Sequence, residues 1–412
     1  MNRWKGGWSS CRAMRTQLLS KMLEQLSFLD SEVDEVTQVM ERSAKEQKEF
    51  DEWRRKKKEA KARFTAMQSL PYKVKVKRAE LRAIEFMEQM EERGCNAHVS
   101  VGGLDSITLL MFLRHIGIDI PAISVSGVED KSIQRVHKDL GIESVKSYKS
   151  KVEVLNEVGF PVISKKIAGR IDLLQHPSPD NETVRHAIMT GECGEQGHYA
   201  KNSRMKLPLR WLKLFGGVEN EKYNTDYQVA PFQVSNKCCY YLKEKPCDDW
   251  AKEYNSWPFL GIMASEGGQR EEALIDHGCN YYGKTVIRSA PFAPFLRRDV
   301  LQQALDLNVP VPEIYGEIRK GADGQLYTTK AQRTGCSMCG FGIHLEPRPH
   351  RFDRLREMNP QEWRFWMYSC CIDKATGEKF GWGRVLDYIG VAWEDYPAVQ
   401  MDMFLDFGIK GN

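Results

Sequence analysis

The chain has 412 residues, of which 42% are hydrophobic and 28% charged, and its formal net charge is +4. This is the composition of a globular protein of two or three domains, and so small a charge does not by itself indicate nucleic-acid binding. No run of about 18 apolar residues occurs, so no membrane span is expected. Residues 1–10 lack the apolar segment of a secretory signal, so we expect a cytoplasmic protein whose 11 cysteines serve metal or redox chemistry more often than disulfides.

Residues 1–92 are predicted to form a helical extension. Apolar residues recur there in alternating steps of three and four: Leu19, Met22, Leu26, Leu29, Val33, Val36 and Met40. This heptad seam fits a helical hairpin packed on its own domain, and it also fits a coiled coil that joins two copies of the chain. Pro71 is expected to end one helix, and a second amphipathic helix is predicted from about Arg78 to Glu92.

A basic run, Arg54-Arg55-Lys56-Lys57-Lys58, lies within this extension. Such a run usually forms a solvated helix face. The alternative is a contact with the phosphate backbone of DNA or RNA, whose affinity would fall steeply with salt concentration.

Residues 93–300 are predicted to form a nucleotide-binding α/β domain. Short apolar strands are expected at 97–101, 121–125, 144–148 and 259–263, and helices at 107–115 and 131–140. Strand–loop–helix repetition of this kind predicts a doubly wound parallel sheet with the nucleotide at the carboxyl ends of its strands. Residues 176–235, rich in Gly, Pro and polar residues, are predicted to be an irregular insertion. Residues 301–412 are expected to form a helical C-terminal lobe.

A glycine loop follows the first predicted strand, with the sequence Gly102-Gly103-Leu104-Asp105-Ser106. The two glycines allow backbone N–H groups to approach an anion, and the helix that follows adds a partial positive charge. Ser106 can donate a hydroxyl hydrogen, and Asp105 can cap the helix or orient a metal or a ribose. A tight strand–helix turn without a ligand is the alternative interpretation.

Two cysteine pairs predict a soft-ligand site. Cys238-Cys239 are adjacent, and Cys336 and Cys339 form a C-x-x-C that follows after a separation of 96 residues. Four thiolates suit a [4Fe–4S] cluster, with Gly335, Gly340 and Gly342 available for backbone N–H bonds to sulfide. Adjacent cysteines are awkward for tetrahedral zinc, which remains an alternative together with metal-free thiols.

These blocks, in this order, resemble phosphoadenosine phosphosulfate reductases of the phage and prophage type, within the adenine nucleotide α-hydrolase superfamily. The resemblance covers about residues 95–395 and rests on the glycine loop, the two cysteine pairs and four further segments: Pro161 to Lys165, Gly261 to Arg270, Ser289 to Val300 and Ile314 to Gly316. The chain departs from the family at Val101 and Leu104, where Ser and Lys are common, and at Met263 and Gly267.

The resemblance implies a fold of the adenine nucleotide α-hydrolase type and a site for ATP or phosphoadenylyl sulfate, with or without Mg²⁺. The residues that it assigns to the nucleotide are Gly102, Gly103, Asp105, Ser106, Glu266, Arg270 and Lys165. It also implies reduction of a sulfonucleotide to sulfite with a thioredoxin-type reductant. The family's C-terminal nucleophilic cysteine motif is not found, and Cys370 and Cys371 are the substitutes that the chain offers.

Two other functions fit the same residues. One is an ATP pyrophosphatase that adenylates a target and transfers sulfur to it, similar to enzymes of DNA phosphorothioation and tRNA thiolation, and the run Arg54–Lys58 suits that nucleic-acid substrate. The other is a non-catalytic regulatory protein that binds a nucleotide or nucleic acid, which the departures at Val101 and Leu104 favour.

Overall fold

The computed structural model describes residues 44–192, 205–217 and 224–394. Its contacts divide the chain into two compact units, Met1–Lys61 and Ala62–Asn412. The predicted heptad seam at 19–40 lies outside the described residues. None of the helices in the described ranges combines the length and apolar character that crossing a membrane requires.

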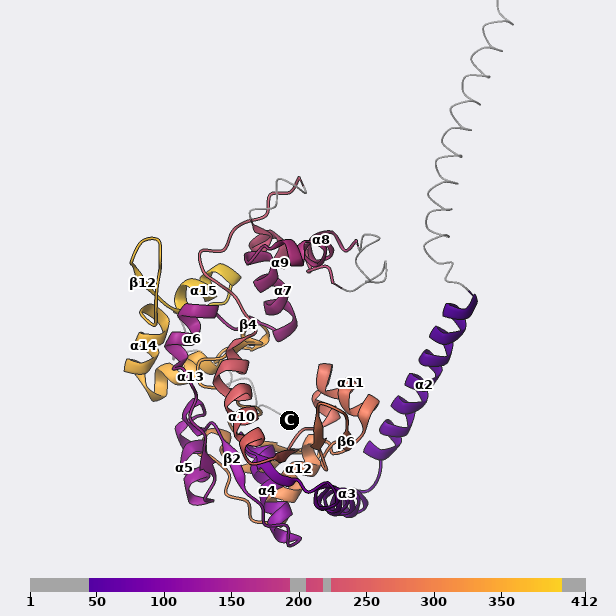
Figure 1. Ribbon diagram of the computed structural model, residues 1–412. Helices are drawn as coiled ribbons and strands as arrows, with labels where there is room; N and C mark the ends of the chain where they lie inside the picture. Colours follow the sequence, from indigo (N-terminus) through magenta and orange to yellow (C-terminus); the bar gives the residue numbers. More distant parts are fainter. Residues whose placement is uncertain (1–43, 193–204, 218–223, 395–412) are drawn as a thin grey trace, which may run out of the picture. The chain divides into compact units, whose positions relative to one another are not determined.

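Helix α2 (Ala44–Gln68) carries the basic run (Figure 1). Arg55 pairs with Glu59 at 3.0 Å and Lys56 pairs with Glu52 at 2.8 Å, each one helical turn away. All four of these side chains are more than half exposed, so solvent screens the ion pairs and they add little to helix stability. This is the solvated face that the charge pattern predicts, and the nucleic-acid contact stays a prediction.

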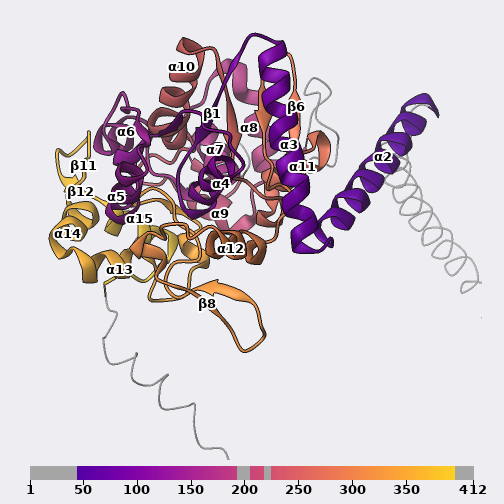
Figure 2. The ribbon, with the colours of Figure 1, turned by 90° about the horizontal axis from the view of Figure 1, so that it is seen from below.

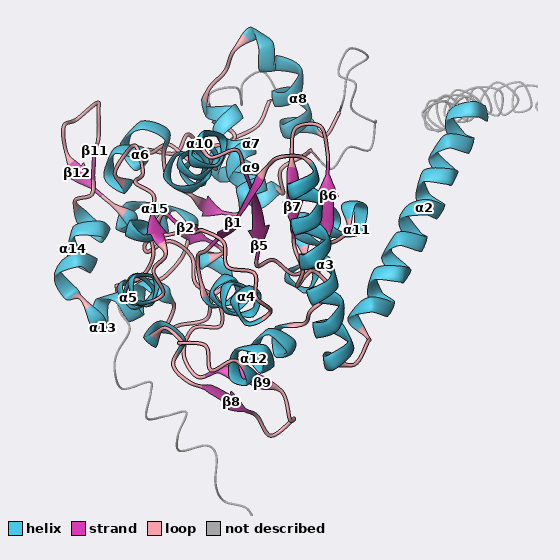
Figure 3. Ribbon diagram, turned by 60° about the horizontal axis from the view of Figure 1, so that its bottom comes forward, coloured by secondary structure: helices cyan, strands magenta, loops and turns pink. Residues whose placement is uncertain are grey.

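The larger unit is mixed α/β with a central, mostly parallel sheet of six strands, which confirms the predicted class at that level (Figure 3). The strand order is β3-β2-β1-β5-β7-β6, and only β6 runs antiparallel to its neighbour. The strands are β1 (Asn96–Ser100), β2 (Ala122–Ser124), β3 (Glu143–Ser144), β5 (Ser256–Leu260), β6 (Asn280–Tyr282) and β7 (Ile287–Ser289). This arrangement is compatible with a doubly wound fold.

The direction of winding reverses between β1 and β5. From β1 the chain proceeds outward through β2 to β3, and β5 lies on the other side of β1, paired with it over five residues. In open α/β sheets, the crevice at the carboxyl ends of the strands beside such a reversal is the usual ligand site. The fold therefore presents one preferred position for a ligand.

Helices pack around this sheet, and most of them contribute to its main hydrophobic core. They are α3 (Tyr72–Glu92), α4 (Leu104–His115), α5 (Lys131–Asp139), α10 (Lys245–Glu253), α11 (Gly268–His277) and α12 (Arg297–Asp306). Pro71 separates α2 from α3, as predicted, but α3 begins at Tyr72, six residues before the predicted start at about Arg78. Helix α3 buries Ala79, Ala83 and Phe86 against β1 and β7. Helix α12 packs against α4 (Figure 2). Beyond α12, β8 (Ile318–Lys320) and β9 (Leu326–Thr328) form a hairpin.

A second hydrophobic core joins two distant parts of the chain. Its buried residues come from 155–234 and from 338–393. The elements there are α6 (Lys151–Val158), β4 (Val162–Ile163), α7 (Lys165–Gln175), α8 (Glu182–Thr190), α9 (Leu209–Phe215), β10 (Gly340–Phe341), α13 (Arg351–Met358), α14 (Pro360–Tyr368), β11 (Cys371–Ile372), β12 (Lys379–Phe380) and α15 (Trp382–Ile389). The segment predicted as an insertion and the C-terminal lobe thus share one core.

The prediction of an irregular segment at 176–235 is wrong for two parts of that range, which form helices, while the other described residues there are mostly turns and loops. Helices α8 and α9 lie within it, and Trp211, Leu212 and Phe215 of α9 are buried in the second core. These helices are short and are flanked by polar and glycine-rich residues, and their apolar residues are buried against a partner segment more than 100 residues away.

Candidate nucleotide loop and cysteine pocket

The glycine loop lies at the reversal of the sheet. It connects the end of β1 to the start of α4, next to the end of β5. The approach is close, since a Cβ atom on Gly261, directly after β5, would lie 2.8 Å from the backbone nitrogen of Ser106. The structure therefore brings Gly102, Gly103, Asp105 and Ser106 to the position where this fold class binds ligands.

Hydrogen bonds hold the loop in a defined shape. Gly102 N–H donates to Ser106 Oγ at 2.7 Å, and Ser106 Oγ donates to the Gly103 carbonyl at 2.9 Å. Leu104 N–H donates to the hydroxyl of Tyr315 at 3.0 Å. Within the described part of the chain, the N–H groups of Gly103, Asp105 and Ser106 have no hydrogen-bond acceptor. Three neighbouring donors at the start of a helix can bind an anion.

Charged side chains surround these donors. Asp105 forms an ion pair with Arg297, whose guanidinium also donates to the Gln332 carbonyl at 3.1 Å. Burial raises the pKa of Asp105, and Arg297 opposes that shift. Glu266 and Arg270 pair at 2.6 Å and both act electrostatically on Asp105. The structure thus gathers Asp105, Glu266 and Arg270, which sequence reasoning assigned to one site, and adds Arg297.

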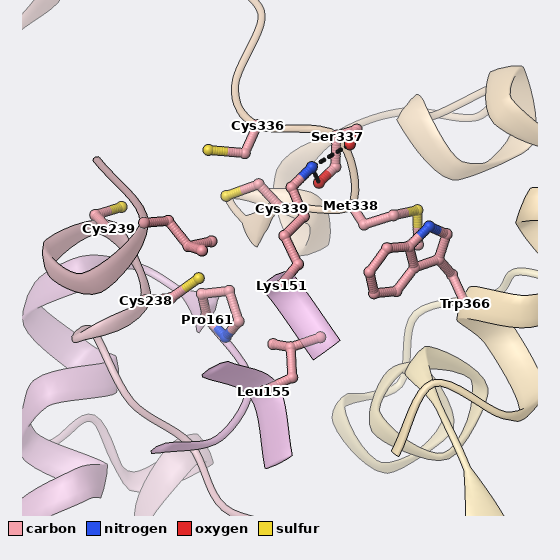
Figure 4. Close-up of a pocket in the computed structure, with 11 residues that line it drawn as sticks. Lys151, Leu155, Pro161, Cys238, Cys239, Cys336, Ser337, Met338, Cys339 and Trp366 are labelled. Atoms are coloured by element: carbon pink, nitrogen blue, oxygen red, sulfur yellow. Dashed lines mark hydrogen bonds between the residues drawn. The ribbon is translucent and has the colours of Figure 1, made fainter. Parts of the chain in front are cut away.

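The four cysteines line one pocket. Cys238 and Cys239 open the helical segment that continues into the π-helical turn η4 (Tyr240–Glu244), and Cys336 and Cys339 come from the loop before β10 (Figure 4). The pocket has a volume of about 370 Å³ with open solvent included, and its other lining residues are Lys151, Leu155, Pro161, Leu242, Ser337, Met338 and Trp366. The chain therefore brings together thiols that 96 residues separate in the sequence.

A short parallel strand pair fixes the C-x-x-C loop. Strand β10 pairs with β4, and Gly342 N–H donates to the Ile163 carbonyl at 2.9 Å. Gly340 has no room for a side chain, because a Cβ there would lie 2.4 Å from the ring of Trp382. Met338 inside the loop has a φ of 59° and Ile163 a φ of 66°. Such strained conformations persist only where the surroundings impose them, which is common beside functional sites.

Cationic side chains surround the thiols. Lys151 Nζ donates to the carbonyls of Val128 at 3.1 Å and Ser337 at 3.2 Å. Arg351 donates to the Cys339 carbonyl at 2.9 Å. Lys165, which the sequence assigned to the nucleotide, lies instead beside Cys239 and pairs with Glu244 at 3.0 Å. The positive charge is placed where four thiolates and a metal cluster would concentrate negative charge.

Burial sets the protonation of the thiols. It raises the pKa of Cys339 to about 11, and it raises the pKa of Cys238 and of Cys239. The neighbouring thiols of the pocket add to the shift of Cys238, whereas Lys165 opposes that of Cys239. Without a metal these three groups are thiols at neutral pH, so binding a metal there must release protons.

An ion pair with a buried carboxylate lies between the glycine loop and the cysteine pocket. The buried Glu129 pairs with Lys243, whose side chain is about one-third exposed and lies near the Cys336 thiol. On the other side, Glu129 Oε1 lies 3.6 Å from the place that a Cβ of Gly102 would occupy. The two candidate sites are therefore adjacent.

The described residues contain no group of three or more His, Cys, Asp or Glu side chains that could hold a single metal ion. A tetrahedral zinc site, with Zn–S bonds of about 2.3 Å, requires sulfur atoms roughly 3.8 Å apart. A cubane cluster is larger and is held at its corners, so its ligands stand further apart. The lining of the pocket contains four thiols and neither imidazole nor carboxylate, a soft donor set that both zinc and an iron–sulfur cluster accept.

Cys370 and Cys371, the candidate nucleophiles, lie in the second hydrophobic core. Each is only 2% exposed, and their sulfur atoms are 3.9 Å apart. The hydrogen bond with Cys370, together with burial, raises the pKa of Cys371. A nucleophilic cysteine requires a thiolate and access to its substrate, so burial supports a packing role for both residues.

Sequence reasoning missed several residues of the site. Lys151, Glu129 and His137 carry no local motif, and each reaches the site through a contact between distant segments. Thr334 and Ser337 lie in the segment of the C-x-x-C, but nothing in the sequence predicts their contacts with Tyr315 and Lys151. Tyr315 and Arg297 lie inside two segments that carry the family resemblance, but nothing in their spacing predicts a contact with the glycine loop.

Comparison with known proteins adds no further assignment. No family model matches the chain. No curated protein matches it at a significant level either.

Proposed function

We propose that this protein is an adenine-nucleotide-binding iron–sulfur protein similar to phosphoadenosine phosphosulfate reductases, with a fold of the adenine nucleotide α-hydrolase type. One observation carries the proposal: four cysteines from two distant segments line one pocket, and that pocket adjoins a glycine loop at the reversal of a parallel sheet. Neither feature alone would indicate this function, because metal pockets and glycine loops each occur in many protein classes.

Cys238, Cys239, Cys336 and Cys339 would hold a [4Fe–4S] cluster. Lys151, Lys165 and Lys243 would offset its negative charge, since each lies beside a thiol of the pocket. When bound, the cluster would supply electrostatic polarisation or redox poise next to the nucleotide. The residues themselves fix its position through the β4–β10 pair and the start of the η4 helical segment.

The nucleotide phosphates would bind at the N–H groups of Gly103, Asp105 and Ser106. Arg270 and Arg297 would supply positive charge, although both are now paired with carboxylates, and those pairs would have to loosen. Asp105 and Glu266 are hard oxygen donors suited to a Mg²⁺ that accompanies the phosphates.

In the proposed reaction, a sulfonucleotide is reduced to sulfite. A thiolate of a thioredoxin-type reductant attacks the sulfate sulfur, and the nucleotide leaves with the bridging oxygen. The second thiol of the reductant then displaces sulfite and forms a disulfide. We place the attacking thiolate on the reductant because both candidate thiols of this chain are buried in the second core.

A product assay tests this function. Anaerobically purified protein is supplied with phosphoadenylyl sulfate, adenylyl sulfate or ATP together with thioredoxin and its reductant. We expect nucleotide-dependent sulfite release. Nucleotide binding without release of sulfite or pyrophosphate would contradict the reductase function and support the non-catalytic regulatory protein. The hydrogen bond from Leu104 N–H to Tyr315 favours that alternative, because it occupies a donor of the glycine loop.

A second candidate is ATP-dependent sulfur transfer to a nucleic acid. The exposed basic run on α2 favours it, because Arg54 to Lys58 form a largely solvated positive segment. Pyrophosphate release from ATP would support this reaction. Salt-sensitive binding of DNA or RNA that disappears when Arg54 to Lys58 are replaced by Gln would support the substrate, and unchanged binding in that variant would exclude the run as the contact.

A further inference from the structure

His137 lies beneath the glycine loop and contacts it directly. Its Nε2 atom is 2.8 Å from the carbonyl oxygen of Gly102, and its Nδ1 atom is 2.9 Å from the hydroxyl of Ser126. The side chain is almost fully buried, with 1% of the residue exposed. Both ring nitrogens thus form hydrogen bonds, and Nε2 bonds to the backbone of the glycine loop.

The hydrogen-bond partners of His137 determine which of its two ring nitrogens carries the hydrogen. A carbonyl oxygen can only accept, so Nε2 must donate to Gly102. Burial lowers the pKa of His137, which keeps the ring neutral, and Nδ1 therefore accepts from the Ser126 hydroxyl. The Gly102 carbonyl therefore selects the tautomer, and Ser126 supports it because its hydroxyl can donate to Nδ1.

This hydrogen bond sets the direction of the next amide. The peptide bond between Gly102 and Gly103 is trans, so its C=O and N–H point in opposite directions. Since the carbonyl points at His137, the Gly103 N–H points away from it. That N–H is one of the three donors of the loop that have no acceptor within the described residues.

Without this restraint the peptide could rotate. Glycine tolerates almost any pair of backbone angles, so the residues that let an anion approach also let the amide turn over. The N–H of Gly102 donates a hydrogen bond to Ser106 Oγ, and the carbonyl of Gly102 accepts one from His137. A turned peptide would present an oxygen, which repels an anion, in place of a donor.

We propose that His137 is a positioning residue that orients the Gly102–Gly103 peptide so that the Gly103 N–H faces a bound phosphate. The ligand is the phosphate chain of a nucleotide or free pyrophosphate, and the inference rests on the proposed nucleotide site. His137 itself does not touch the ligand. Its placement comes from helix α5, whose start is capped by the Asp130 side chain, which accepts from Ser132 N–H at 2.8 Å.

The test compares three ligands and two substitutions in the full chain. Dissociation constants for pyrophosphate, ATP and adenosine are measured by calorimetry for the wild type, His137→Met and His137→Gln. The Met side chain fills the space without a donor, whereas Gln can place an amide N–H near the position of Nε2. We expect His137→Met to weaken pyrophosphate and ATP binding about tenfold and to leave adenosine binding unchanged.

The conservative variant separates positioning from packing. His137→Gln should bind pyrophosphate and ATP within about threefold of the wild type, because the donor to Gly102 is restored. His115→Met, an exposed histidine at the end of α4, serves as the matched control and should change nothing. If His137→Met fails to fold, Ser126→Ala carries the test, with an expected loss of about threefold for pyrophosphate and ATP and none for adenosine.

Three outcomes overturn the inference, and they are distinguishable. If the wild type binds pyrophosphate or ATP and His137→Met and Ser126→Ala bind them equally well, His137 does not orient the loop. The same holds if both variants lose adenosine to the same extent as ATP, since the loss would then be general. If the wild type binds neither pyrophosphate nor ATP, the proposed nucleotide site itself fails, and this inference fails with it.

Discussion

The hydroxyl of Tyr315 accepts a hydrogen bond from the backbone N–H of Leu104 at 3.0 Å, and Gly103 is the residue that makes room for it. A Cβ atom on Gly103 would lie 2.2 Å from that hydroxyl. The same hydroxyl lies 2.6 Å from Thr334 Oγ1, two residues before Cys336. Tyr315 therefore occupies a donor of the glycine loop from within the protein.

Removing this hydroxyl should strengthen anion binding. Tyr315→Phe frees the Leu104 N–H, and one net hydrogen bond is worth about 0.5–1.5 kcal/mol, so we expect pyrophosphate affinity to rise roughly two- to tenfold. Calorimetry with the exposed Tyr327→Phe as a control measures this. Weaker pyrophosphate binding by Tyr315→Phe would mean that Tyr315 supports the loop and does not compete with the ligand.

Local sequence patterns predicted the glycine loop and the four cysteines of the site. The strand, the two glycines and the apolar helix follow one another within 20 residues, and β1, the loop and α4 form where expected. The adjacent Cys238 and Cys239 and the C-x-x-C could be paired by ligand chemistry alone. The glycine loop needs only short-range order, which a sequence pattern records.

Long-range packing determined the rest. Strand β4 is only two residues long and depends on Gly340 and Phe341, which lie 178 residues away. Glu129 and Lys243 are ordinary charged residues in the sequence, and only the fold buries Glu129 and places Lys243 beside it. Lys165 was predicted at the nucleotide site but lies beside the cysteines for the same reason. It is the first residue of α7, and the position of β4 determines where that helix begins.

Lys75 and Asp299 form a buried ion pair that joins α3 to α12. Their side chains are 2% and 6% exposed. Lys75→Met would leave Asp299 as an uncompensated buried charge, and we expect a loss of about 3–5 kcal/mol in the free energy of unfolding. Urea denaturation measures this. Lys77→Met, which removes an exposed pair with Glu80, should cost less than about 1 kcal/mol, and an equal loss in the two variants would contradict the account.

His98 makes the fold sensitive to acid. It lies in β1 with Nδ1 at 2.8 Å from Ser256 Oγ of β5, and burial lowers its pKa from 6.5 to about 4. A lowered histidine pKa means that the unfolded chain takes up the proton first, so the stabilisation is present above about pH 6.5 and is lost as the pH falls toward 4.

At pH 5 this loss should amount to about 2 kcal/mol relative to pH 7. Urea unfolding at the two pH values measures it in the wild type and in His98→Asn, which cannot titrate. The difference between pH 7 and pH 5 should be about 2 kcal/mol smaller in the variant. Equal differences in the two proteins would show that His98 does not carry the effect.

Cys370 and Cys371 should be chemically inert in the native protein. Both are buried, and the pKa of Cys371 is raised, so neither offers an accessible thiolate. We expect mass spectrometry to find neither residue alkylated after iodoacetamide treatment at pH 7.5, and the double substitution Cys370→Ala with Cys371→Ala should retain sulfite release. Loss of turnover in a folded double variant would make one of them the nucleophile.

The pocket formed by Cys238, Cys239, Cys336 and Cys339 is the centre of this account, and its metal content can be measured directly. The decisive experiment determines iron, acid-labile sulfide and zinc in anaerobically purified wild type and in Cys336→Ser, with Cys247→Ser as the control outside the pocket lining. We predict about four irons and four sulfides per chain in the wild type and in Cys247→Ser, with a broad visible absorbance that Cys336→Ser loses. A colourless wild-type protein that contains zinc or no metal would contradict the account.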